Sequence, residues 1–349
     1  MRAAVLYGAQ DVRVEHEIDE PSPGDGEVLL RPLYNGICGS DLHFWQEGPR
    51  HGVKPPIILG HEFSAEVVGA GPGVDQSRLP PGVLVAVEPM WTCGTCPSCR
   101  RGAYNVCRRA VWHGLSGKGG GMSGLTVVRA GMVHRLPETV DALQGALVEP
   151  VSVAHHGVTR SRVRPGEVAL VLGAGPIGVA AVLDLRARGV ERIVVSEPAA
   201  RRRAAVTAAV TAVGGGDVHV LDPQEVDLVD AVRAVTAGEG AGVVIDAAGV
   251  EPAFHTGLAA AAPGGRMVVI ASYTKPVTYD PVETFFGEID IIASCGYRGD
   301  FPEVIELMAK GAYPMDGWVR HIGLDCVPDG FHRLHAGLEM KLLVDVQGT

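Results

Sequence analysis

The sequence predicts an α/β protein in which a β-rich first domain is followed by a doubly wound parallel sheet. At 349 residues the chain is too long for one compact core and suits two domains. As far as about residue 135, short apolar or alternating runs are separated by glycine and proline clusters, which is typical of strands and turns. From about residue 165, apolar runs of strand length alternate with segments of helix length, and this alternation predicts a parallel sheet flanked by helices.

The expected elements follow these runs in chain order. In the first domain, where helices should be scarce, strands are expected over residues 3–7, 28–33 and 84–87. In the second domain, strands are expected at the apolar runs 168–172, 192–195, 242–246, 266–271 and 289–294. Helices are expected between them over residues 176–188, 199–213 and 227–236.

The net charge and the N-terminus bear on partners and location. A formal charge of -10 leaves no broad basic surface for nucleic acid or an anionic membrane, so a small-molecule ligand is favoured. The apolar run 168–185 is broken by glycines, Pro176 and Asp184, which argues against a membrane span. The N-terminus turns polar by Asp11 and lacks the pattern of a signal peptide, so a cytoplasmic location is expected.

A glycine-rich turn links the strand expected at 168–172 to the next helix. Strand, turn and helix come in the order that a dinucleotide-binding site requires. The first glycine permits the tight turn, the second lets the backbone approach a pyrophosphate, and the third lets the helix pack on the strand. A purely structural turn is the alternative, but the flanking elements favour a cofactor site formed by Gly173, Gly175, Pro176, Ile177 and Gly178.

A carboxylate follows the next expected strand. Glu197 lies nineteen residues after Gly178, where it can accept hydrogen bonds from the adenosine ribose hydroxyls. Because a carboxylate repels a 2′-phosphate, this favours NAD over NADP. Three arginines at 201–203 complicate the prediction, since one of them, with Arg202 as the candidate, could reach a 2′-phosphate. A solvated helix face is the alternative role for these arginines.

Four of the seven cysteines fall within fifteen residues, as Cys93, Cys96, Cys99 and Cys107. Short turns between them can bring four thiolates into a tetrahedron around zinc, and a site closed in this way would be structural. An iron-sulfur cluster and incidental thiols are the alternatives. The sequence has no second cysteine group and no companion redox motif, so zinc is favoured.

A second set of metal-capable residues is spread along the first domain. Cys38 lies in GICGSDLH (36–43), His61 and Glu62 in GHE (60–62), and Glu149 precedes Pro150. Cysteine, histidine and glutamate suit zinc. Taken singly, however, a cysteine is usually a small buried apolar residue and a histidine a satisfied polar one.

At these residues the sequence resembles the zinc-containing medium-chain alcohol dehydrogenases. The resemblance is carried by GICGSDLH, GHE, the four-cysteine lobe and VLGAGPIG (171–178), in family order over essentially the whole chain. Within the family it is similar to the butanediol and polyol branch, judging from 87–89, 147–150, 196–198 and 341–344. Departures from the pattern are Ala65, the turn 82–84 and the lack of a cysteine before Ala247, and none of these is a proposed ligand.

The resemblance implies a domain plan and two zinc ions per chain. It implies a GroES-like catalytic domain over 1–152, with a structural zinc lobe at about 90–110, a Rossmann dinucleotide-binding domain over 153–290, and a segment 291–349 that completes the catalytic domain. It also implies a catalytic zinc shell of Cys38, His61 and Glu149, with Glu62 as a ligand that exchanges with water or substrate. Ser40 would receive the alcohol proton and pass it toward His43 through the cofactor ribose.

The resemblance further implies reversible oxidation of a secondary alcohol or vicinal diol to the ketone, with 2,3-butanediol and acetoin as model substrates, in a homodimer or homotetramer. A polyol or L-threonine dehydrogenase is the enzymatic alternative, because those branches share the motifs. A non-catalytic zinc- and nucleotide-binding sensor is the alternative of another class, and the intact set Cys38, Ser40, His43, His61 and Glu149 argues against it.

Other residues have open roles. The candidates for the wall of a substrate pocket are Phe44, Trp45, Trp112, His113 and Tyr273, and each of them could equally be ordinary core or surface. Asp246 ends an expected strand, where it could face the cofactor crevice or cap the following turn.

Overall fold

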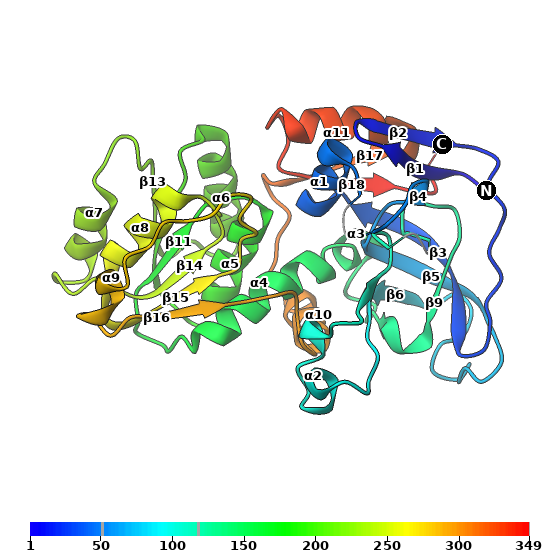
Figure 1. Cartoon of the computed structure of the whole chain (residues 1–349), viewed down its shortest axis with the longest axis horizontal. Helices are drawn as coiled ribbons and strands as arrows, with labels where there is room; N and C mark the ends of the chain where they lie inside the picture. The colour runs from blue at the N-terminus through cyan, green and yellow to red at the C-terminus, as the bar shows by residue number, and fades with distance from the viewer. Residues whose placement is uncertain (50–51, 117–118, 349) are drawn as a thin grey trace. The chain divides into compact units, whose positions relative to one another are not determined.

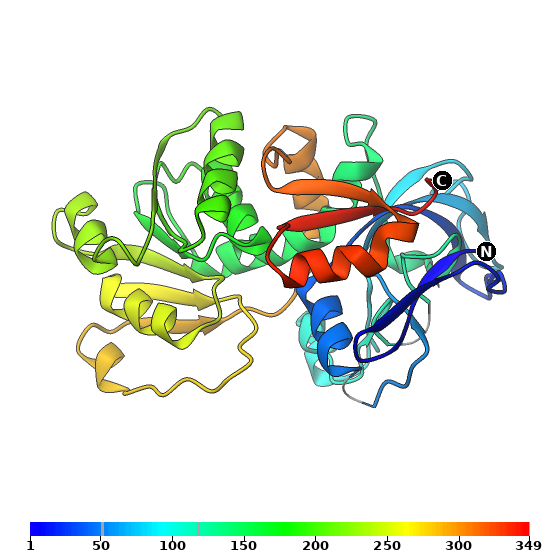
Figure 2. The same ribbon diagram turned by 90° about the horizontal axis from the view of Figure 1, so that it is seen from above.

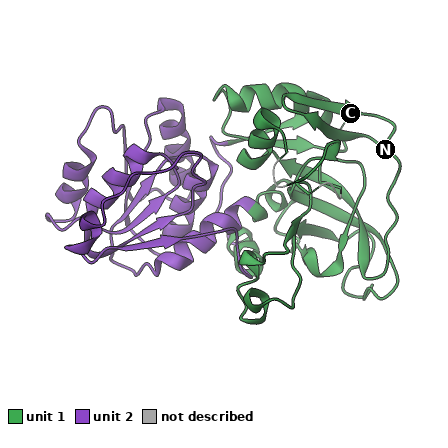
Figure 3. Ribbon diagram, viewed as in Figure 1, with its two compact units in different colours: residues 1–149, 301–309, 319–349 green, residues 150–300, 310–318 purple. Residues whose placement is uncertain are grey.

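The computed structural model describes residues 1–49, 52–116 and 119–348, and the chain divides into two compact units (Figures 1 and 3). Unit 1 comprises residues 1–149, 301–309 and 319–349, and unit 2 comprises residues 150–300 and 310–318. The sequence predicts domain boundaries after residues 152 and 290. In the structure, residues 291–300 and 310–318 pack with unit 2. None of the described helices is both long enough and apolar enough to cross a membrane.

Unit 1 is built on a mostly antiparallel sheet in the order β10-β6-β5-β3-β18-β17, with β9 also paired to β3. Val28 and Leu30 alternate inward from β3 and pack against Phe63 and Val85 in one apolar core. The strands of this sheet are β3 (Glu27–Gly36), β5 (Glu62–Ala70), β6 (Leu84–Val87), β9 (Thr126–Arg129), β10 (Val133–Arg135), β17 (Val319–Gly323) and β18 (Lys341–Asp345). Two smaller sheets join β2 (Asp11–Glu15), β1 (Ala3–Gly8) and β4 (Ile57–Ile58), and β7 (Met90–Trp91) with β8 (Val111–Trp112).

The helices of unit 1 are short, in keeping with the β-rich prediction. They are α1 (Gly39–Glu47), α2 (Pro97–Arg100), α3 (Ala142–Gly145), α10 (Phe301–Ala309) and α11 (Val327–His335), with single 3₁₀ turns at Tyr104–Val106, Ala130–Met132 and Leu324–Cys326. Helix α1 packs against α11 through Trp45, whose ring lies 6.0 Å from that of Phe331 between centroids. This contact anchors the helix that follows Cys38.

The end of the chain completes the unit 1 sheet. Strand β18 pairs antiparallel with β3, which places Leu343 opposite Gly36 and Asp345 opposite Tyr34. Strand β5 pairs with the other side of β3, and Glu62 also lies opposite Gly36. The C-terminal strand is thus brought beside the segment that leads into Cys38.

Unit 2 holds a six-stranded, fully parallel sheet in the order β13-β12-β11-β14-β15-β16. This is the strand order 3-2-1-4-5-6 of the Rossmann fold, so the predicted fold class is confirmed. The strands are β11 (Ala169–Leu172), β12 (Arg192–Ser196), β13 (Asp217–Leu221), β14 (Ala241–Asp246), β15 (Ala261–Val269) and β16 (Asp290–Ala293). The helices are α4 (Val148–Ser161), which begins in unit 1, α5 (Pro176–Ala187), α6 (Ala200–Ala212), α7 (Leu228–Val235), α8 (Glu251–Ala260) and α9 (Val282–Phe285).

Helices cover both faces of the unit 2 sheet (Figure 2). Helix α5 packs with α6, and α7 packs with α8. Leu172 and Val244 of the sheet share an apolar core with Leu228 of α7 and Leu258 of α8. The strand order reverses between β11 and β14, and in an open parallel sheet the carboxyl ends of the strands at such a point form the crevice that binds ligands.

Candidate active site and cofactor pocket

Three predicted ligands meet in unit 1. One ligand atom each from Cys38, His61 and Glu62 lies within 4.8 Å of the others. Cys38 comes directly before α1, while His61 and Glu62 stand at the start of β5, so the neighbouring strands β3 and β5 bring the group together. His61 and Glu62 are buried, which means that their polar atoms must be satisfied by protein groups or by a metal.

The surroundings of His61 fit a metal ligand. Its Nε2 lies 3.2 Å from Oγ of Ser40, and its Nδ1 lies 3.5 Å from Oδ1 of Asp41. Burial lowers the pKa of His61, but the charges of Asp41 and Cys38 outweigh burial and raise that pKa well above its usual range. An environment that favours a cation so strongly suits a divalent metal, and a carboxylate beside the second ring nitrogen is the usual partner of a metal-bound histidine.

Asp41 was not among the predicted site residues, although it lies inside GSDLH. Its side chain is fully buried, and its Oδ2 accepts a hydrogen bond of 2.9 Å from the backbone N–H of Cys38. The Oδ1 atom of Asp41 and the Nδ1 atom of His61 are both buried, and neither has a hydrogen-bond partner among the described residues. Asp41 therefore contacts both Cys38 and His61, and it is placed to orient both.

Lys341 is a second residue that sequence reasoning missed. Its ammonium forms an ion pair with Glu62, both side chains are 2% exposed, and it also donates to the carbonyl of Ile37 at 3.2 Å. Burial lowers the pKa of Lys341, but the charges of Glu62, Cys38 and Glu149 outweigh burial and raise it. A Cβ on Gly36 would collide with the Glu62 carboxylate and lie 2.9 Å from Nζ of Lys341, so this pair needs a glycine at position 36.

The remaining predicted catalytic residues also belong to unit 1. Glu149 stands in the first turn of α4 and is 5% exposed, but it is not part of the group within 4.8 Å. Ser40 and His43 both belong to α1, where residues three apart lie on neighbouring positions of one helix face. Ser40 contacts a predicted metal ligand, His61, through its hydroxyl.

The four-cysteine cluster is well formed. The Sγ–Sγ distance is 3.5 Å for Cys96 to Cys99 and for Cys93 to Cys107, and 3.9 Å for Cys93 to Cys99 and for Cys96 to Cys107. A regular tetrahedron with zinc-sulfur bonds of about 2.3 Å has edges of about 3.8 Å. A hydrogen bond from the Thr95 backbone lowers the pKa of Cys93 to about 5, so this group is a thiolate at neutral pH. The cluster fits zinc without rearrangement.

The glycine turn between β11 and α5 has a distinct requirement at each position. Gly173 has φ of 87°, a left-handed conformation that favours glycine. A Cβ on Gly178 would collide with the carbonyl oxygen of Gly173, so helix and strand could not approach as they do. A Cβ on Gly175 would meet no protein atom within 4 Å, and this is the open side of the turn. Pro176 and Ile177 form the first turn of α5, whose free N–H groups suit a phosphate.

A cavity of about 490 Å³ in unit 2 begins at this turn. Gly173, Gly175, Glu197, Arg202 and Val250 are among its lining residues. Glu197 is 3% exposed, and its two oxygens accept hydrogen bonds of 2.9 Å from the N–H groups of Ala174 and Ala199. The cavity therefore connects the glycine turn to the carboxylate predicted to bind ribose.

The three arginines have different surroundings. Arg203 forms an ion pair of 2.7 Å with Asp222 and donates to the carbonyls of Glu197 and Pro198. Arg202 lines the cavity, and its guanidinium lies 3.9 Å from the Glu197 carboxylate. Of Arg202 and Arg203, only Arg202 stands where it can meet a cofactor.

Most of the aromatic candidates for a pocket wall are packed in the fold. Phe44 and Trp45 belong to the apolar cluster of α1 and α11. His113 is buried beside Thr126 at 2.8 Å, and burial lowers its pKa to about 4. Trp112 pairs with Met90 across β7 and β8.

Tyr273 and Asp246 of unit 2 contact each other. Tyr273 donates to Asp246, and Asp246 also accepts from the N–H groups of Ala248 and Gly249. Asp246 therefore caps the turn after β14.

Comparison with known proteins agrees with both parts of this geometry. The model of the alcohol dehydrogenase GroES-like domain matches residues 24–138, and the model of the zinc-binding dehydrogenase domain matches residues 176–310. An (R,R)-butanediol dehydrogenase from Neisseria gonorrhoeae is 34% identical over 96% of each chain. An L-threonine 3-dehydrogenase from Pyrococcus horikoshii is 33% identical over 98% of this chain and 97% of the relative.

A solved structure gives the same result. The crystal structure of 2R,3R-butanediol dehydrogenase from Bacillus subtilis superposes with a TM-score of 0.89, at 32% identity and over 99% of both chains. The predicted resemblance is thus confirmed. The chain belongs to the zinc-dependent medium-chain alcohol dehydrogenases, nicotinamide-linked enzymes that act on CH–OH groups.

Proposed function

We propose that this enzyme oxidises a secondary alcohol or vicinal diol of the 2,3-butanediol type to the ketone, reversibly and with NAD. The observation that carries the proposal is the group of the half-buried Cys38 and the buried His61 and Glu62, with Ser40 in contact with His61. The relatives named butanediol dehydrogenase support the substrate class, because they match along nearly the whole chain.

The residues divide into ligands and proton carriers. Cys38 and His61 would hold the catalytic zinc, with Glu149 and the exchangeable Glu62 completing its shell. When bound, zinc lowers the pKa of an alcohol hydroxyl, and the nicotinamide ring accepts hydride. Ser40 would take the alcohol proton and pass it toward His43, while Asp41 holds Cys38 and His61 in place. The four-cysteine lobe would hold a second, structural zinc.

A threonine or polyol dehydrogenase is the competing proposal, since a threonine dehydrogenase matches almost as well. Steady-state NADH formation by zinc-loaded enzyme on (R,R)-2,3-butanediol, sorbitol and L-threonine separates these activities. We expect kcat/KM to be highest on the butanediol. A clear preference for threonine or sorbitol would contradict the proposed substrate, and NADH formation on no alcohol of a wider panel would favour a non-catalytic relative.

The preference for NAD is proposed to depend on Glu197. Replacing Glu197 by glutamine removes the charge that repels a 2′-phosphate and leaves Arg202 free to attract it. The ratio of kcat/KM with NAD to kcat/KM with NADP should fall by about tenfold or more, in line with the loss of one charged contact. Arg202→Gln in the same assay is the matched control and should raise that ratio or leave it unchanged. An unchanged ratio in Glu197→Gln would mean that Glu197 does not contact the ribose.

Two further expectations stay predictions. The first is that the chain forms a homodimer or homotetramer, which a measurement of its molar mass in solution by light scattering would test. A cytoplasmic location is expected from the sequence alone.

A further inference from the structure

Unit 2 contains a second cavity, of about 440 Å³, at the C-terminal half of α4. It is lined by three arginines, Arg160, Arg162 and Arg298, and by the buried pair His156 and Asp300. None of the residues that line it also lines the dinucleotide cavity. On a chain whose net charge is -10, a cavity with three guanidinium groups and one carboxylate is a local excess of positive charge.

Two of the three arginines are not neutralised. Arg162 forms an exposed ion pair of 2.9 Å with Asp290. The guanidinium groups of Arg160 and Arg298 have no hydrogen-bond or ion-pair partner among the residues that the structure describes. The carboxylate of Asp300 is already engaged, because it accepts from the backbone N–H of Arg298 and lies 3.1 Å from Nδ1 of His156.

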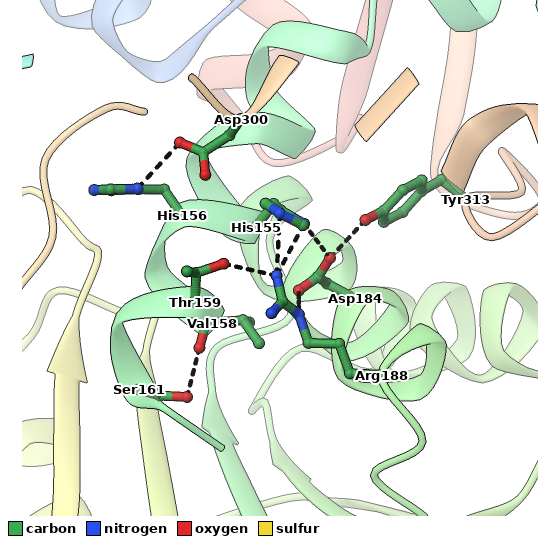
Figure 4. A network of polar contacts seen from close by, with 9 residues as sticks. All are labelled: His155, His156, Val158, Thr159, Ser161, Asp184, Arg188, Asp300 and Tyr313. Carbon is green, nitrogen blue, oxygen red and sulfur yellow. Dashed lines mark hydrogen bonds and ion pairs between the residues drawn. The ribbon is translucent and has the colours of Figure 1, made fainter. Parts of the chain in front are cut away.

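His156 adds a buried polar atom to this cavity. The residue is 4% exposed and lies in α4. Figure 4 shows one ring nitrogen turned toward Asp300 and the other turned away from it. Burial raises the pKa of Asp300, but the contacts with His156 and with the Arg298 backbone outweigh burial and lower it, so Asp300 is anionic at neutral pH. Nδ1 of His156 faces Asp300, so Nε2 is the ring nitrogen left to face a ligand.

Hydrogen bonds and ion pairs hold α4, which lines the cavity, against the end of α5 (Figure 4). Arg188 donates to Oγ1 of Thr159 at 2.7 Å and to the buried carboxylate of Asp184 at 2.7 Å. Asp184 also accepts from the hydroxyl of Tyr313 at 2.6 Å and contacts His155 at 2.7 Å. This network holds α4 against α5 and keeps the buried carboxylate of Asp184 paired within it.

We propose that this cavity binds a small, multiply charged anion of the phosphate class, held by Arg160, Arg298 and Nε2 of His156. Guanidinium groups form paired, charge-assisted hydrogen bonds with phosphate oxygens, and a buried imidazole adds a directed donor. The site is separate from the dinucleotide cavity, so a phosphate-bearing ligand can occupy it while the cofactor is bound.

Isothermal titration of the zinc-loaded enzyme, saturated with its preferred nicotinamide dinucleotide, tests the proposal. Inorganic pyrophosphate is the probe, orthophosphate and glycerol 3-phosphate are the second and third arms, and chloride of equal ionic strength is the reference. We expect saturable binding of pyrophosphate that chloride does not reproduce. Tighter binding of glycerol 3-phosphate than of orthophosphate would identify a phosphate ester as the ligand class, and the reverse order would identify free phosphate.

Arginine variants locate the binding. Arg298→Gln and Arg160→Gln should each weaken pyrophosphate binding by about tenfold, the scale of one charge-assisted contact. Arg164→Gln is the matched control, because Arg164 is exposed on the segment after α4 but does not line the cavity. An absence of saturable binding, or an equal loss in Arg164→Gln, would overturn the proposal. Because this experiment measures binding and not turnover, a failure of the anion-site proposal would not count against the proposed dehydrogenase activity.

Discussion

Replacing Cys38 by serine should lower kcat/KM by about 10³-fold or more, because Cys38 is the thiol of the group that can hold the catalytic zinc. Serine keeps the size of the side chain but replaces a thiolate with a hydroxyl, which is a much weaker zinc ligand at neutral pH. Since Asp41 also holds the backbone of Cys38, the fold of this segment should persist in the variant. Initial rates of NADH formation under zinc-buffered conditions measure the effect.

Cys326→Ser is the matched control for this experiment. Cys326 belongs to the same unit, is exposed and lies before α11, outside both metal-capable groups of the described residues. Its replacement should leave kcat/KM within about twofold, as expected for a surface substitution. Wild-type turnover in Cys38→Ser would mean that the catalytic centre lies elsewhere.

Replacing Lys341 by methionine should lower the free energy of unfolding by about 3 kcal/mol. Methionine is similar in length to lysine but leaves the Glu62 carboxylate without the ammonium that now faces it, in a setting where both side chains are 2% exposed. Removing one partner of a buried ion pair costs more than the pair itself contributes, because a buried charge is left uncompensated. Chemical denaturation of the zinc-loaded enzyme, followed by far-UV circular dichroism, measures the change.

The double variant Lys341→Met with Glu62→Gln shows whether the loss of stability comes from the unpaired charge of the Glu62 carboxylate. Once the carboxylate is also neutral, the double variant should recover much of the stability lost in Lys341→Met. Lys310→Met, at an exposed lysine, should leave the free energy of unfolding within about 0.5 kcal/mol. If Lys341→Met is as stable as the wild type, the ion pair is not the main partner of Glu62.

Much of unit 2 was predictable because its periodicity is local. The apolar runs at 168–172, 192–195 and 242–246 became β11, β12 and β14, and each of them is buried along most of its length. Strand β13 was missed, since Asp217–Leu221 mixes charged and apolar residues and is only half-buried. It pairs with β12 and is tied to it by Arg192 and Asp217 at 2.6 Å.

Helix α8 was missed for a different reason. Glu251–Ala260 contains a proline and a glycine, both poor helix formers in a helix interior. The proline occupies the first turn, where it is tolerated. A Cβ on Gly257 would come within 2.8 Å of the Leu172 side chain and 3.2 Å of the Val244 side chain, so close packing on the sheet explains the glycine. Tertiary contact overrides local preference here.

The candidate site shows the same division between local and distant information. The motifs at 36–43 and 60–62 are short, and they contain Cys38, His61 and Glu62, the three residues of the metal-capable group. Lys341 is 279 residues from its partner Glu62, and no local pattern reveals that β18 will pair beside β3. A lysine that directly precedes the apolar run 342–344 in β18, as Lys341 does, was the available sign of a buried pair.

The zinc content of the enzyme, measured together with its turnover, tests the central claim most directly. Elemental analysis of fully loaded protein should give about two zinc per chain, one held by the four-cysteine lobe and one by the group around Cys38 and His61. A mild chelator should remove one zinc and abolish NADH formation, and added zinc should restore both. Cys38→Ser should retain about one zinc per chain. Full activity in protein that contains only one zinc per chain would contradict the two-site account.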